Sequence, residues 1–144
     1  MNVHDLRRRV VELFGDESRR SSTQVTVLSF GYKHGVPPDA DLVFDCRFLP
    51  NPHWVDDLRP KTGLDLEVQE YVASFELTEQ FLARLYPLLE LLLPAYLEEG
   101  KSILTIAFGC TGGKHRSVSM AERAAVWLRG QGIEPRLRHR DVAK

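Results

Sequence analysis

The sequence predicts an α/β domain with a small mixed, mainly parallel sheet that is flanked by helices. Three observations indicate this class. Short apolar runs rich in β-branched residues recur along the chain, stretches with apolar residues at helical spacing lie between them, and loops rich in glycine and proline separate the two kinds of segment. Strands that alternate with helices favour parallel pairing, and ligand loops in such sheets follow the carboxyl ends of the strands.

The strands are expected where the short apolar runs stand. These runs cover residues 24–30, 41–46, 102–108 and 135–138. Loops follow the first three of them, after Phe30, Cys46 and Phe108. Because parallel strands end at one edge of a sheet, we expect these three loops to lie together.

The helices are expected in four places: residues 3–14, 65–75, 78–99 and 116–129. Asp65 and Thr78 are placed to cap the second and third of these. Pro87 and Pro94 should kink or split the third, because proline lacks the backbone N–H that a helix interior uses. The proline-bearing stretch 48–63 is expected to be irregular.

The composition indicates a single domain over residues 1–144, with an N-terminal helix and loop over 1–22 and an α/β core over 23–144. Hydrophobic residues make up 43% of the chain and the net charge is −1, so a general affinity for polyanions is not expected. Basic residues nevertheless cluster near both ends. No apolar run is long enough for a membrane span, and no apolar region follows the polar N-terminus, so we expect a cytoplasmic protein.

The two cysteines, Cys46 and Cys110, are too few for a disulfide scaffold in a domain of this size. No Cys/His spacing suggests a zinc site. The sequence therefore predicts neither a metal nor a cofactor.

The segment Gly109–Ser117 carries the strongest functional signal. It lies between an expected strand and an expected helix, and Gly112 and Gly113 allow successive backbone N–H groups to point inward. The start of the helix adds a partial positive charge. Further donors and charges come from the side chains of Thr111, Lys114, His115, Arg116 and Ser117. The alternative is a plain glycine turn, but this combination of residues favours a phosphate-binding loop, although its spacing is not that of a Walker A loop.

A second interpretation fits the same segment. Cys110, five further residues, Arg116 and Ser117 match the Cys-x5-Arg-Ser/Thr signature of cysteine phosphatases, in which a thiolate attacks phosphorus. Gly109 stands where those enzymes usually have histidine, and no general acid is evident, although Asp45 and Asp57 remain candidates. The interpretation favoured for Cys110 is a small buried residue at the end of a strand.

The loops after the first two strands supply further candidates. Asp45, Arg47, Asn51 and His53 could bind a phosphate or a sugar hydroxyl from a loop that prolines stiffen. In the alternative, Asp45 pairs with Arg47 while Phe48 and Trp54 join the core. After the first strand, Tyr32, Lys33 and His34 suit a nucleobase, or form a plain turn.

Near the C-terminus, Arg136, Arg138 and Arg140 alternate with other residues. In a strand they would line one face and form a track for a phosphate backbone; an ordinary solvated charge run is the alternative. The arginines of residues 7–9 are interpreted as the solvent-exposed face of the first expected helix.

The chain resembles the C-terminal domain of the RapZ family, the RNase adapter proteins of bacteria. The resemblance rests on motifs that span nearly the whole chain in family order: residues 29–35, 39–41, 43–45, 47–54, 58–60, 62–63, 109–118 and 138–140. Full-length members carry an N-terminal P-loop domain that has no counterpart in these residues, so its nucleotide binding is not carried over. Cys46 stands where an apolar residue is commoner, and the tail after Arg140 lacks the lysine-rich ending of some members.

The resemblance implies an RNA-binding domain that recognises small regulatory RNA and helps to present it to an endoribonuclease. It also implies a pocket that senses glucosamine-6-phosphate and so links RNA turnover to the supply of cell-envelope precursors. The matching pocket residues are His53, Thr111, Gly112 and Arg116, with Asp45, Arg47 and Asn51 as neighbours.

The sequence and the resemblance together predict a regulatory domain rather than an enzyme. We expect it to form a homo-oligomer, or even to serve chiefly as an oligomerisation module. The residues expected to contact RNA are Lys33, His34, Lys114, Arg136, Arg138, His139 and Arg140.

Overall fold

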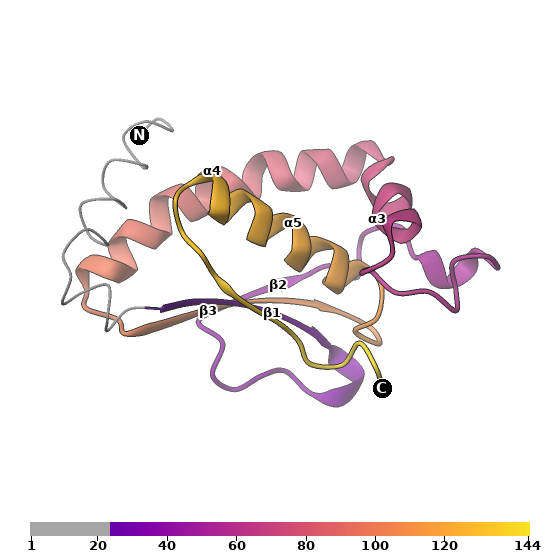
Figure 1. Cartoon of the computed structure of the whole chain (residues 1–144), viewed down its shortest axis with the longest axis horizontal. Coiled ribbons are helices and arrows are strands. Elements are labelled where there is room, and N and C mark those ends of the chain that lie inside the picture. Colours follow the sequence, from indigo (N-terminus) through magenta and orange to yellow (C-terminus); the bar gives the residue numbers. More distant parts are fainter. Residues whose placement is uncertain (1–23) are drawn as a thin grey trace.

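The computed structural model describes residues 24–144, which form a four-stranded sheet with helices packed on one side (Figure 1). The strands lie in the order β2-β3-β1-β4 and every pair is parallel, so the α/β class is confirmed and the described sheet is not mixed. The strands are β1 (Gln24–Gly31), β2 (Leu42–Asp45), β3 (Ile103–Cys110) and β4 (Arg136–His139). The helix expected over residues 3–14 and the arginines of residues 7–9 lie outside the described residues.

The central strands β1 and β3 pair in register from Gln24 opposite Ile103 to Gly31 opposite Cys110. Both are almost fully buried toward their carboxyl ends, as expected for the middle of a parallel sheet. All four strands run in one direction, so the loops that follow them meet at one edge. This confirms the expected meeting of the loops after the first three strands.

The helical side of the sheet holds the main core. Val27 of β1 and Ile106 and Phe108 of β3 are fully buried in one apolar cluster with Leu89 and Leu93, which both come from the long helix over residues 76–98. Burial of each such side chain stabilises the fold by about 1.5–3 kcal/mol. On the opposite side of the sheet, the described segment 32–41 packs Tyr32 and Ala40 on a small second cluster (Figure 1).

Helix α4 (Glu76–Glu98) runs through both of its prolines without interruption, so the predicted split does not occur (Figure 1). Pro87 is exposed, whereas Pro94 is buried with the leucines that face the sheet. Burial of this apolar face outweighs the backbone hydrogen bonds that the prolines remove. The cap predicted at Thr78 is wrong: the helix begins earlier, and the Thr78 hydroxyl donates instead to the carbonyl of Val72.

The other helices lie close to their predicted ranges. They are α3 (Leu66–Ala73) and α5 (Arg116–Gly130). Asp65 is the N-cap residue of α3, although its carboxylate accepts from the backbone N–H of Thr62 rather than from the helix. Helices α4 and α5 contact each other through Tyr86 and Trp127, whose rings stack with centroids 5.0 Å apart.

Two stretches expected to be irregular contain short 3-10 turns, η1 (Tyr32–His34) and η2 (Pro52–Trp54). In η2 the side chain of Asn51 accepts the backbone N–H of His53 and so starts the turn. Among the described helices, none combines the length and the apolar character that a bilayer span requires.

Candidate functional site

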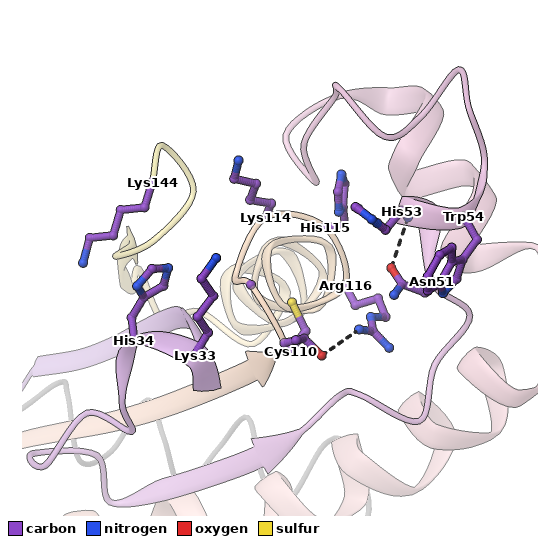
Figure 2. Close-up of a pocket in the computed structure, with 12 residues that line it drawn as sticks. Lys33, His34, Asn51, His53, Trp54, Cys110, Lys114, His115, Arg116 and Lys144 are labelled. Carbon is purple, nitrogen blue, oxygen red and sulfur yellow. Dashed lines mark hydrogen bonds between the residues drawn. The ribbon is translucent and has the colours of Figure 1, made fainter.

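The loops at the carboxyl ends of the strands enclose a cavity of about 440 Å³ (Figure 2). Every strand contributes residues to it from the segment that follows. The residues that line it are Lys33, His34, Asn51, His53, Trp54, Cys110, Thr111, Gly112, Lys114, His115, Arg116 and Lys144. The sequence had assigned most of them to ligand or RNA. Trp54 had been placed in the core only as an alternative, and Lys144 had not been assigned to the site.

The segment between β3 and α5 has free backbone donors, as a phosphate-binding loop requires. Within the described chain, no backbone N–H from Thr111 to Val118 donates to a protein acceptor. The residue before α5, His115, provides no side-chain cap. A helix start without a cap leaves N–H groups and a partial positive charge that an anion can satisfy.

The two glycines of this loop differ in their surroundings. Gly113 has a φ of +81°, and a side chain there would come within 2.6 Å of the backbone nitrogen of Gly31. The loop therefore packs backbone against backbone on the end of β1. Gly112 has ordinary backbone angles, and a side chain there would meet open space. Of the two, only Gly112 lines the cavity.

Arg116 is buried, with 5% of its surface exposed. Its Nη1 donates to the carbonyls of Arg47 at 2.6 Å and Leu49 at 3.2 Å, and its Nη2 lies 3.4 Å from the hydroxyl of Thr111. Much of the Arg116 guanidinium, which the sequence predicted as a phosphate donor, is thus engaged with the loop after β2. The Nε atom is buried and has no hydrogen-bond partner among the described residues.

His115 is also buried, and its Nε2 lies 3.2 Å from the carbonyl oxygen of Arg59. Burial lowers the pKa of His115 below its ordinary value, although nearby carbonyls oppose the shift. The ring is therefore neutral at neutral pH and supplies polarity rather than charge. His53 lies beside Trp54 on the same wall of the cavity (Figure 2).

Asp45 and Arg47 do not line the cavity. They pair with each other, with Arg47 Nη2 2.7 Å from Asp45 Oδ2, and the guanidinium lies 3.8 Å above the ring of Tyr32. Hydrogen bonds from Arg47 hold the pKa of Asp45 below its usual range. The structural alternative of a pair is confirmed for these two residues. The accompanying alternative, in which Phe48 and Trp54 join the core, is wrong, because both side chains are exposed and Trp54 exposes 76% of its surface.

Cys110 and Ser117 lie beneath the loop. The Sγ atom of Cys110 is 3.1 Å from the Oγ atom of Ser117, and both residues are buried. Cys110 forms part of the cavity wall, whereas Ser117 does not. The hydroxyl of Ser117, predicted as a ligand donor, therefore contacts the thiol instead.

Asp141 organises this edge of the sheet and was missed in the sequence, because a single carboxylate after a basic run forms no motif. Its side chain is fully buried and accepts hydrogen bonds from the backbone N–H of Gly31, from Arg140 and from Lys144. Burial opposes ionisation, but these bonds outweigh it and hold the pKa of Asp141 well below its usual range.

The predicted arginine track lies on the side of the sheet away from the helices. Arg136 and Arg138 are exposed next to Thr26 and Leu28 of β1, along a second cavity of about 560 Å³. Arg140 also lines this cavity but is held by Asp141 and by the carbonyl of Gly35. The three arginines thus share one surface, with Arg136 and Arg138 free of protein partners in the described chain.

The structure separates the other expected RNA contacts from this track. His139 points to the helical side, where its ring nitrogens contact Ser29 Oγ at 2.7 Å and Glu122 Oε1 at 2.9 Å. Lys33, His34 and Lys114 line the first cavity instead. Among residues 24–144, no group of three or more His, Cys, Asp or Glu side chains could hold a metal ion.

Comparison with known proteins agrees with this architecture. The RapZ C-terminal domain family matches residues 23–143. Nucleotide-binding proteins of Symbiobacterium thermophilum, Thermobifida fusca and Streptomyces griseus are 53%, 50% and 51% identical over 144 residues. All of the chain is covered in each case, but only 48%, 49% and 43% of the relatives. The chain thus spans about half the length of these curated relatives, and it belongs to the RapZ C-terminal domain family.

Proposed function

We propose that this chain is a binding and regulatory domain, which holds the phosphate of a sugar phosphate in the first cavity and RNA on the arginine track. Glucosamine-6-phosphate is the ligand that the family resemblance suggests. The proposal depends on one observation: the uncapped amides from Thr111 to Val118 open beside a buried Arg116 whose Nε has no partner. Free amides at a helix start favour a phosphate.

The lining of the cavity supports an anionic ligand. None of the described residues that line it is an aspartate or glutamate, whereas lysines approach from three loops. Asn51 and His53 stand on the opposite wall and offer polar groups to sugar hydroxyls (Figure 2).

A substitution at Gly112 tests the site without disturbing the fold. A side chain at this position meets open space, so Gly112→Val should fold normally and fill part of the cavity. We expect calorimetric titration to show binding of glucosamine-6-phosphate to the native chain and a loss of at least about 10-fold in affinity in the variant. Gly130→Ala, at another glycine with open space around it, should bind like the native chain. Unchanged affinity in Gly112→Val would remove the site assignment.

RNA binding is assigned to Arg136 and Arg138. Their side chains project from one face of β4, roughly 6.6 Å apart along the strand, which suits successive phosphates. We expect Arg136→Ala and Arg138→Ala each to weaken binding of a structured RNA and to reduce the slope of log K against log salt by about one. Arg84→Ala removes an exposed arginine from α4 and serves as the control. A binding constant that does not change with salt would contradict phosphate contacts.

Adapter function follows as part of the same proposal. The bound RNA would be a small regulatory RNA that the domain helps to present to an endoribonuclease, and sugar-phosphate level would modulate this step. The cytoplasmic location, the homo-oligomer and the endoribonuclease partner stay predictions of the sequence and of the family resemblance.

A cysteine-dependent phosphatase is the second candidate. One observation favours it: Cys110 lines the cavity, and its Sγ lies 3.1 Å from Ser117 Oγ, a contact that could stabilise a thiolate. Arg116 argues against it, because its guanidinium is bound to the carbonyls of Arg47 and Leu49. We expect no turnover of an aryl phosphate between pH 5 and 8; turnover that Cys110→Ser abolishes would establish the enzyme instead.

A further inference from the structure

One wall of the cavity carries three lysines, of which Lys114 belongs to the phosphate loop and the other two come from other segments. Figure 2 shows Lys33, Lys114 and Lys144 on one side of Cys110, and Arg116 with His53 on the other. The lysines come from three separate segments, which follow β1, β3 and β4. The backbone N–H of Lys33 donates to the carbonyl of Thr111, so this wall is tied to the phosphate loop.

The charges on this wall are poorly balanced within the protein. No carboxylate of residues 24–144 pairs with Lys33 or Lys114, and Lys144 shares Asp141 with Arg140. Like charges gathered in a concave site create a local positive potential that attracts anions. A single phosphate bound to the loop amides and Arg116 would leave most of the positive charge of the three lysines without a neutralising anion.

We propose that the cavity takes a ligand with two phosphate groups, one on the Thr111–Val118 amides and the other on the lysine wall. This inference rests on the proposed phosphate site and extends it to a ligand class, the bisphosphates. The cavity of about 440 Å³ lies within the size range of small-molecule sites.

The lysine wall also affects the affinity for a sugar that carries an amine. An ammonium group near Lys33 and Lys114 would be repelled, whereas a phosphate in the same place would be attracted. A sugar bisphosphate is therefore expected to bind more tightly than an amino-sugar monophosphate. The same chemistry could come from a free metabolite or from the phosphorylated end of a nucleic acid.

Calorimetric titration of the 144-residue chain separates these cases. The ligands are glucose 6-phosphate, glucose 1,6-bisphosphate, adenosine 3′,5′-bisphosphate and inorganic pyrophosphate, in which the two phosphates adjoin with no sugar between them. We expect glucose 1,6-bisphosphate to bind at least about 10-fold more tightly than glucose 6-phosphate, and pyrophosphate to show no such gain. Tighter binding of the adenosine compound than of the sugar bisphosphate would identify a nucleic-acid end as the source of the second phosphate.

Matched variants assign the gain to the wall. The double variant Lys33→Ala/Lys114→Ala should lose the advantage of the bisphosphate, so that glucose 1,6-bisphosphate and glucose 6-phosphate bind it with affinities within about 3-fold of each other. Arg138→Ala removes a free cation from the other side of the sheet and should keep the advantage. Equal affinity for mono- and bisphosphates, or equal loss in Arg138→Ala, would overturn the inference alone. Absence of binding by every phosphate compound would overturn the proposed function with it.

Discussion

Gly112 and Gly113 are neighbours in one loop but have different roles. Gly113 holds the loop against β1 in a backbone conformation that other residues rarely adopt, whereas Gly112 leaves space for a ligand. The sequence shows two glycines and predicts a loop, but it does not distinguish these tasks, because both depend on what packs nearby.

Gly113→Ala is expected to lower the free energy of unfolding by about 1–3 kcal/mol. The positive φ strains any L side chain, and the new methyl group would lie 2.9 Å from Cβ of Asp141. Urea denaturation measures the change, and Gly112→Ala should stay within about 0.5 kcal/mol of the native chain. Similar losses in the two variants would show that the positive φ of Gly113 is not decisive.

Asp141→Asn is expected to destabilise the fold at neutral pH by about 1–3 kcal/mol, because the neutral amide no longer balances Arg140 and Lys144. The folded state lowers the pKa of Asp141, so this carboxylate stabilises the fold above its unfolded pKa of about 4 and loses that effect as the pH falls. The gap between the native chain and the variant should therefore shrink from pH 7 toward pH 2.

The midpoints of urea denaturation of the native chain and of Asp141→Asn, compared across this pH range, measure the difference in stability. Asp45→Asn provides the control, because its pair with Arg47 is exposed and exposed pairs contribute at most about 1 kcal/mol. A gap for Asp141→Asn that stays constant with pH would contradict a role for its charge.

Among the elements, α4 departs most from expectation. The sequence marks its prolines as breaks, but it does not reveal that the leucine-rich face lies fully against the sheet. The tertiary contacts decide the outcome there. Helix α5 shows the opposite case, since apolar periodicity and a preceding glycine loop were enough to predict its range.

Pro87→Ala should stabilise the protein by up to about 3 kcal/mol, because alanine restores the missing N–H donor at an exposed position of α4. Pro94→Ala should gain less, since Pro94 is buried and the smaller side chain leaves a cavity. Chemical denaturation of the two variants compares them. A loss of stability in Pro87→Ala would mean that the proline is required for the path of the helix.

At the scale of the whole molecule, the sequence was sufficient for the class, the strands and the meeting of loops at one edge. These features follow from local patterns and from the geometry of parallel sheets. The partners of individual side chains were not predictable. Distant packing decides that Arg116 bonds to carbonyls of the loop after β2 and that His139 turns to the helical side. It also buries Asp141 between two cations.

The two tryptophans of the chain occupy unlike places, and this gives the molecule two separate optical signals. Trp54 stands exposed on the rim of the cavity, so its fluorescence should respond when a ligand arrives. Trp127 is stacked on Tyr86 between α4 and α5, so its emission should shift only when those helices separate. Replacement of either indole by phenylalanine would let one spectroscopic experiment follow occupancy while the other follows unfolding.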